Sequence, residues 1–171
     1  MAWFSRNKDE PSARVEAPAE TRGPEAQSDE PTPELPLRPV IRRLGVEEQQ
    51  RIARGRTALE EAGIDVGDLD ALGRAFDAAM TGWLDTPVRQ REGHDAIVER
   101  FAIGVGEHLD RHTDLSWALV TDAFGTDLAV AGGRDDFVVV PSNLVAARWL
   151  NEERGWLPGV VGHLVRVRAS R

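Results

Sequence analysis

The chain contains no cysteine and no tyrosine, and Lys8 is the single lysine among its 21 basic residues. Without cysteine it can form no disulfide, no thiolate nucleophile and no cysteine-ligated zinc site. No stretch approaches the ~18 consecutive apolar residues of a membrane-spanning helix. After Met1, the only apolar residues before the first charged side chain are Ala2, Trp3 and Phe4, too few for the apolar region of a secretory signal peptide. These absences favour a cytoplasmic protein, and the preference for arginine over lysine is typical of a GC-rich bacterial genome.

A concentrated positive charge is also missing. The formal net charge is −8, whereas nucleic-acid binding needs a clustered basic surface that can neutralise phosphates. We therefore expect no nucleic-acid partner, and an anionic membrane surface is disfavoured for the same reason. The segment GVGEHL at 104–109 begins like a dinucleotide-binding loop but has no third glycine and follows no predicted strand. We expect no cofactor.

Residues 1–43 differ in composition from the rest of the chain. Seven of the ten prolines lie here, among Glu, Ala, Ser and Thr. Such a segment buries too little apolar surface to offset the entropy lost on ordering. We predict a disordered tail over 1–43 and a single α+β domain over 44–171. Trp3 and Phe4 at the tip could make at most a weak peripheral contact with a membrane, and a frayed terminus is the simpler interpretation.

Helical patterns dominate the first half of the predicted domain. Residues 46–63 are rich in helix formers and end at a glycine. Residues 68–84 have apolar side chains, Phe76 among them, at the spacing of one helix face, and Asp68 is a suitable N-cap. A third helix is expected from 88 to 112. Its interior Gly104 lowers helix stability, which a close approach by another element would explain.

Strand signals follow the third helix. Residues 115–121 combine aromatic and branched side chains, and two shorter apolar runs follow at 128–131 and 137–140, with short turns between the three segments. Two short connections predict an antiparallel three-stranded meander, with the N-terminal helices packed on it.

One or two C-terminal helices complete the predicted fold. Pro141 ends the third strand, and Ser142 and Asn143 are candidate N-caps for the helix that follows. Residues 157–168 fit a second helix, while a strand through the alternate residues from Val161 to Val167 remains open.

Two histidines form the most enzyme-like feature of the chain. His108 and His112 are four residues apart, so both rings could reach one metal ion from the same helix face. A third ligand is not evident, because His94 lies ~21 Å away along the expected helix. The simpler interpretation is that these histidines border the core.

Acidic residues cluster at the predicted turns. Asp122 and Asp127 flank one turn, and Asp135 and Asp136 lie in the other. Carboxylate pairs can perform acid–base chemistry or hold a hard cation. The two pairs lie at opposite ends of a short strand, ~15 Å apart, so they cannot form one site. A role in the turns themselves is the simpler interpretation.

The other chemical signatures that we sought have simpler explanations. No G-x-S-x-G nucleophile elbow occurs in the chain. Four tryptophans could form an aromatic binding platform, but most of them lie on predicted apolar faces, which favours packing in the core. These tryptophans are Trp83, Trp117, Trp149 and Trp156.

Residues 115–149 resemble a family of small bacterial domains of unknown function. The pattern is W-x4-D-x-[FY]-G-x-D, followed by a hydrophobic strand, a proline and a helix with a basic residue. It is carried here by Trp117, Asp122, Phe124, Gly125, Asp127, Val138 to Pro141, and Arg148. The resemblance covers roughly 67–154 and implies an α+β fold without an established activity. Its polar positions, Asp122, Asp127 and Arg148, are the candidate site residues.

Two functions therefore remain open. The absence of catalytic motifs and the acidic domain favour a non-catalytic protein-interaction or regulatory module whose protein partner is unknown. A tail would extend its reach by raising the effective concentration of the tethered partner. The alternative is a small hydrolase or metal-binding enzyme that uses Asp122 and Asp127, or His108 and His112.

Overall fold

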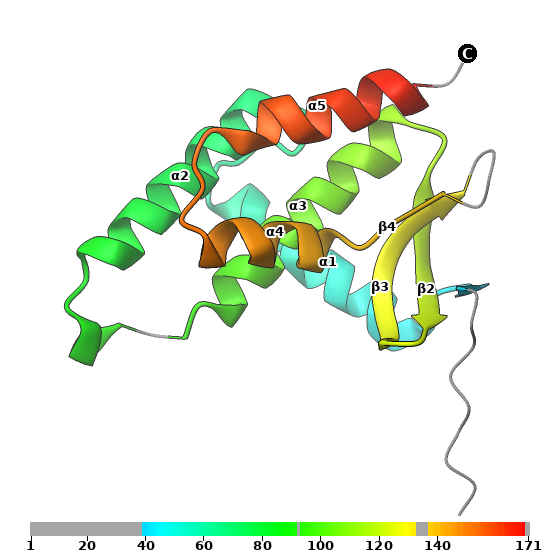
Figure 1. The fold of residues 1–171 in the computed structure, drawn as a ribbon, viewed down its shortest axis with the longest axis horizontal. Coiled ribbons are helices and arrows are strands. Elements are labelled where there is room, and N and C mark those ends of the chain that lie inside the picture. The colour runs from blue at the N-terminus through cyan, green and yellow to red at the C-terminus, as the bar shows by residue number, and fades with distance from the viewer. Residues whose placement is uncertain (1–38, 92, 133–136, 170–171) are drawn as a thin grey trace, which may run out of the picture. The chain divides into compact units, whose positions relative to one another are not determined.

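The computed structural model describes residues 39–91, 93–132 and 137–169. Within these ranges the chain is α+β, with five α-helices and one four-stranded antiparallel sheet (Figure 1). The elements in chain order are β1 (Val40–Arg42), α1 (Val46–Glu61), α2 (Leu69–Asp85), the short 3-10 helix η1 (Val88–Gln90), α3 (Asp95–His112), β2 (Ser116–Asp122), β3 (Gly125–Gly132), β4 (Phe137–Val139), α4 (Pro141–Leu150) and α5 (Trp156–Arg168). None of the helices in these ranges is both long and apolar enough to cross a membrane.

The sheet contains one strand more than predicted. Its order is β1-β2-β3-β4, so the expected meander is present, but β1 pairs with β2 as an additional edge strand. This strand lies within the segment 1–43 that the composition assigns to a tail. Strand β1 has only three residues, too few to show the alternating pattern of a strand in the sequence. Their hydrogen-bond partners are on β2, where Ile41 pairs with Val120, about eighty positions along the chain. Residues 1–38, with Trp3 and Phe4, and the predicted turn acids Asp135 and Asp136 lie outside the described residues.

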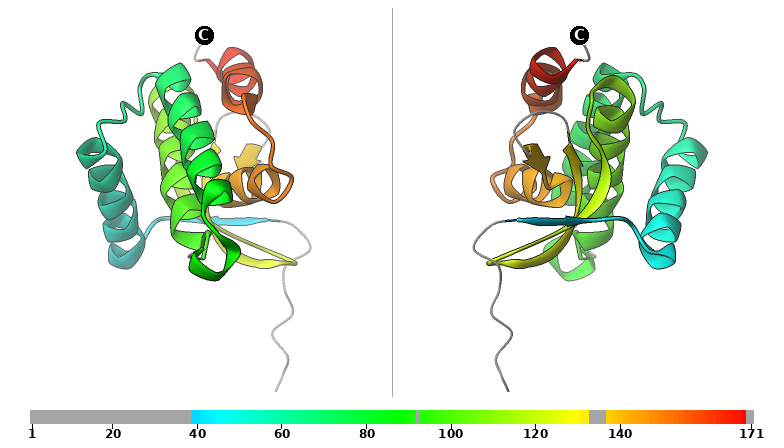
Figure 2. Two further views of the ribbon diagram at one scale, coloured as in Figure 1. Left: turned by 90° about the vertical axis from the view of Figure 1, so that its left-hand side faces the viewer. Right: turned by 90° about the vertical axis from the view of Figure 1, so that its right-hand side faces the viewer.

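Helix α3 lies at the centre of the arrangement. It contacts α1, α2, α4 and α5, and also β2 and β3. Helix α1 lies on one side of α3, and α4 and α5 lie on the other (Figure 2). Gly104 on α3 allows α2 to approach closely, because a Cβ there would lie 2.8 Å from the Leu72 Cδ1 atom. The predicted reason for a glycine at this position is therefore confirmed.

Phe76 on α2 is the centre of the main core. Its side chain is fully buried and makes edge-to-face contacts with Phe101, Trp149 and Trp156, with ring centroids 5.4 to 5.7 Å apart. The predicted apolar face of this helix is confirmed, and Trp149 and Trp156 pack in the core as expected. Asp68 caps the same helix by accepting a hydrogen bond from the Ala71 backbone N–H.

The prediction of one continuous helix over 88–112 is wrong. The chain forms η1, leaves helical geometry and begins α3 only at Asp95. Arg91 explains the break, since its guanidinium donates to the backbone carbonyls of Leu84 and Thr86 at the end of α2. These hydrogen bonds hold the connecting segment against α2, and nothing in the local periodicity of the sequence indicates them.

The two C-terminal helices are present, with one difference in detail. Helix α4 begins at Pro141 itself, so Ser142 and Asn143 lie in its first turn and are not its caps. Proline suits this position because the first backbone N–H groups of a helix have no intrahelical acceptor. Residues 157–168 lie in α5, which excludes the alternative of a strand.

Candidate functional site

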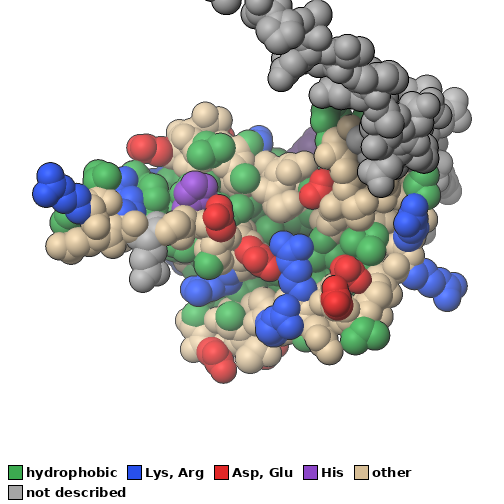
Figure 3. Space-filling view, turned by 90° about the horizontal axis from the view of Figure 1, so that it is seen from below, with side chains coloured by type: hydrophobic (Ala, Val, Ile, Leu, Met, Phe, Trp, Pro, Cys, Tyr) green, Lys and Arg blue, Asp and Glu red, His purple; other side chains and the backbone are tan. Residues whose placement is uncertain are grey.

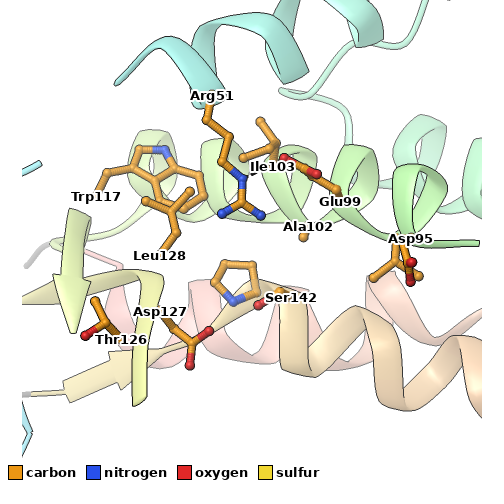
Figure 4. Close-up of a pocket in the computed structure, with 12 residues that line it drawn as sticks. Arg51, Asp95, Glu99, Ala102, Ile103, Trp117, Thr126, Asp127, Leu128 and Ser142 are labelled. Carbon is orange, nitrogen blue, oxygen red and sulfur yellow. Dashed lines mark hydrogen bonds and ion pairs between the residues drawn. The ribbon is translucent and has the colours of Figure 1, made fainter. Parts of the chain in front are cut away.

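A groove of about 230 Å³ lies between α1, α3, β3 and the start of α4 (Figure 4). Its apolar floor consists of Val98, Ala102 and Ile103 on α3 together with Leu128 on β3. The indole of Trp117, on β2, closes one end. The floor and the end wall together thus combine residues from one helix and two neighbouring strands.

Charged side chains from different elements surround this floor. Arg51 on α1 extends into the groove and its Nε donates to Glu99 Oε1 on α3 at 2.6 Å. Asp127 on β3 and Ser142 on α4 line the opposite side. Asp95, at the start of α3, completes the acidic lining. Among the described residues that line the groove, one arginine therefore faces three carboxylates, and two negative charges have no counterpart.

A buried carboxylate fixes the end wall. The Trp117 Nε1–H donates to Glu107 Oε1 at 3.0 Å, and only 5% of the Glu107 side chain is exposed. Arg56 on α1 and Arg111 on α3 both donate to the second oxygen of Glu107. Because buried charges are stable only when paired and hydrogen-bonded, this network holds the indole in one position.

Gly106 provides the space for that indole. A Cβ at Gly106 would overlap the six-membered ring of Trp117, so the ring lies directly on the backbone of α3. Sequence reasoning missed both Glu107 and the role of Trp117 at the groove. The signal that could have indicated them is the second glycine inside a helix, followed at once by a glutamate.

A second acid lies next to this network. Burial raises the pKa of Asp110, and the nearby Glu107 carboxylate raises it further. Hydrogen bonds to Asp110 from the Trp117 backbone and the Ser116 side chain act in the opposite direction. The two carboxylates lie at the junction of α3 and β2, beneath the groove wall.

His108 and His112 lie together, as their spacing predicts, with ring centroids 4.4 Å apart. His108 is buried, and its Nδ1 donates to the Val66 carbonyl at 2.8 Å. Burial lowers the pKa of His108, and the charges of His112 and Arg111 add to the effect, which exceeds the opposing influence of the Val66 hydrogen bond. Within the described part of the chain, no three His, Asp or Glu side chains are placed to hold a metal ion.

The three polar positions of the resemblance have different surroundings. Asp122 Oδ1 accepts a hydrogen bond from the Phe124 backbone N–H at 2.7 Å, as expected of a turn residue. Arg148 lies over the Trp156 ring, 5.5 Å from its centroid, and faces Glu153 at 3.5 Å. Asp127 lines the groove, and neither Asp122 nor Arg148 does.

Residues 82–158 match the family model of a domain of unknown function, DUF3806. The predicted resemblance to a family of unknown function is thereby confirmed, with a later start than the sequence suggests. The match spans α3, the sheet strands β2 to β4 and α4, and so contains most of the groove but not Arg51. No curated protein and no solved structure matches the chain.

Proposed function

We propose that the protein is a non-catalytic interaction module of the bacterial cytoplasm whose groove binds a segment of a partner protein. The observation that carries the proposal is the apolar floor on α3 and β3, bordered by charged side chains from α1, α3 and β3. Protein interfaces have this arrangement, with an apolar centre that excludes water and a polar rim that sets the orientation of the partner.

The size of the groove supports a protein ligand. Pockets for small molecules commonly measure ~300–1,000 Å³ and enclose most of the ligand. At about 230 Å³ this groove is smaller, and its charged lining is half-exposed, since Arg51 and Glu99 are 47% and 46% exposed. Such a site fits one or two side chains of a peptide segment better than a whole metabolite.

The framework of the groove supports binding without rearrangement. Helix α1 lies against α3 so closely that a Cβ at Gly55 would be 2.8 Å from the Ile103 Cγ1 atom. Trp117 is held by the buried Glu107. A surface that is already ordered loses little conformational entropy on binding, so more of the contact energy contributes to affinity.

Ser142→Trp tests the proposal. Ser142 is partly exposed in the first turn of α4 and lines the groove, so an indole at this position would occupy the space of the ligand. Asn143→Trp is the matched control, because Asn143 is exposed and does not line the groove. Circular dichroism and urea unfolding would verify that both variants fold.

The experiment compares proteins captured from the cytoplasm of the source bacterium by the full wild-type chain and by each variant. We expect a partner that the wild-type chain and Asn143→Trp retain and Ser142→Trp loses. Titration calorimetry with the purified partner should then give one-to-one binding, weakened at least about tenfold by Ser142→Trp. Equal binding to wild type and Ser142→Trp would contradict a role for the groove.

A further inference from the structure

We infer that the groove selects a basic partner segment in which an arginine or lysine stands next to an apolar side chain. The inference rests on the proposed function and specifies the chemistry of the ligand. It follows from the charges that the groove leaves unmatched and from the apolar floor beside them.

Arg51, the single cation among the described residues that line the groove, already has a partner. Arg51 Nε lies 2.6 Å from Glu99 Oε1, the shortest distance of an arginine–carboxylate pair among the described residues. An acidic ligand would have to compete with Glu99 for this guanidinium, and it would also approach Asp95 and Asp127. Like charges that meet at an interface strongly disfavour binding, so the groove selects against acidic segments.

The acids on the two sides of the groove are available. The Asp127 carboxylate makes no ion pair and no hydrogen bond with any of the residues that the structure describes. Asp95 is 99% exposed, and its Oδ1 lies 3.9 Å from His94 Nε2, beyond hydrogen-bonding distance. A guanidinium or ammonium group of a partner could therefore pair with Asp127 without displacing an existing interaction.

The floor suits the rest of such a ligand. Arginine and lysine have long aliphatic stems that can lie on apolar surface while the charged end reaches a polar partner. Leu128 adjoins Asp127 on β3, and Ala102 faces the same space from α3 (Figure 4). An apolar residue next to the cation in the ligand would cover the remaining floor.

The net charge of the chain agrees with this charge preference. The full chain has a formal net charge of −8, so a basic segment would be attracted over a distance before contact forms. Acidic and basic side chains are intermixed on the face seen from below, with hydrophobic side chains between them (Figure 3). The attraction should weaken as salt screens the charges.

Selection of peptides from a phage-displayed random library on the full chain tests the inference. We expect the selected peptides to be enriched in arginine and lysine next to leucine, isoleucine, valine or phenylalanine. Synthetic copies should bind with an affinity that falls as sodium chloride is added. Asp127→Asn should raise their Kd about fivefold, as expected for loss of one partly exposed ion pair.

Two further variants separate the possible outcomes. Asp70→Asn makes the same charge change at an exposed position of α2 that does not line the groove, and it should leave the Kd unchanged. Ser142→Trp should abolish binding of the selected peptides. If the selected peptides were acidic or uncharged and Ser142→Trp abolished their binding, the charge preference would be wrong and the groove would remain the binding site. A selection that yields only peptides insensitive to Ser142→Trp, or no peptides, would overturn the proposed function itself.

Discussion

Replacing Gly106 by alanine should destabilise the protein, although the position lies inside a helix. Alanine normally stabilises a helix interior by ~1 kcal/mol relative to glycine. At Gly106, however, the added Cβ would overlap the six-membered ring of Trp117. The ring cannot turn aside easily, because its Nε1–H is bonded to the buried Glu107.

The expected magnitude follows from these opposing effects. Overpacking in a rigid site costs about 1–3 kcal/mol. A weakened hydrogen bond to a charged acceptor costs about 1.5–3 kcal/mol more. Subtracting the gain in helix propensity of about 1 kcal/mol, we expect Gly106→Ala to lower the free energy of unfolding by about 1.5–5 kcal/mol.

Gly82→Ala provides the matched comparison. Gly82 lies in α2, is exposed, and a Cβ there would have no atom within 4 Å. This variant should be more stable than wild type by up to about 1 kcal/mol. Urea unfolding of both variants, followed by circular dichroism, measures the difference directly. If Gly106→Ala were as stable as Gly82→Ala, Trp117 would not lie on the backbone of α3, and the end wall of the groove would be misassigned.

Two further predictions concern the core and the response to pH. Phe76→Ala should lower the free energy of unfolding by about 3–5 kcal/mol, because the ring is fully buried among three aromatic neighbours, and a loss below about 1 kcal/mol in urea unfolding would contradict this packing. Because the pKa of His108 is lowered from 6.5 in the folded state, the unfolded chain binds the proton first as pH falls below 6.5, and stability should fall by at most about 1.4 kcal/mol per pH unit. His108→Asn, which keeps a donor for Val66, should lose this part of the decline as the pH falls through 6.5, whereas an unchanged slope would exclude His108 as its source. The exposed His163→Asn is the control for loss of an imidazole, and comparison with wild type removes the contribution of Asp110, whose raised pKa acts in the opposite direction.

Local patterns in the sequence determined much of the fold. The apolar face around Phe76 predicts α2, and Asp68 caps it, because helix periodicity and capping involve residues only a few positions apart. The strands β2 to β4 and the turn at Asp122 follow from β-branched runs and from local hydrogen bonding. The family resemblance depends on the same segment, and the match of residues 82–158 to the family model confirms it.

The elements that sequence reasoning missed depend on contacts over long separations. Strand β1 forms because β2 offers it backbone partners, and the helix predicted over 88–112 is interrupted because Arg91 bonds to the end of α2. Neither contact can be recognised from the periodicity of the local sequence, because the hydrogen-bonding groups that form it belong to two different elements.

The residues of the groove also differ in whether the sequence alone could indicate them. The chain alone indicates that Asp127 is a polar position near a turn, and that His108 and His112 share a helix face. Only the tertiary structure brings Arg51 and Asp127, which are far apart in sequence, to one apolar floor and leaves Asp122 in its turn. Composition and periodicity determine which residues are buried or exposed within each element. The packing of α1 and the sheet against α3 decides which exposed charges meet, because that packing fixes distances between elements that no local pattern encodes.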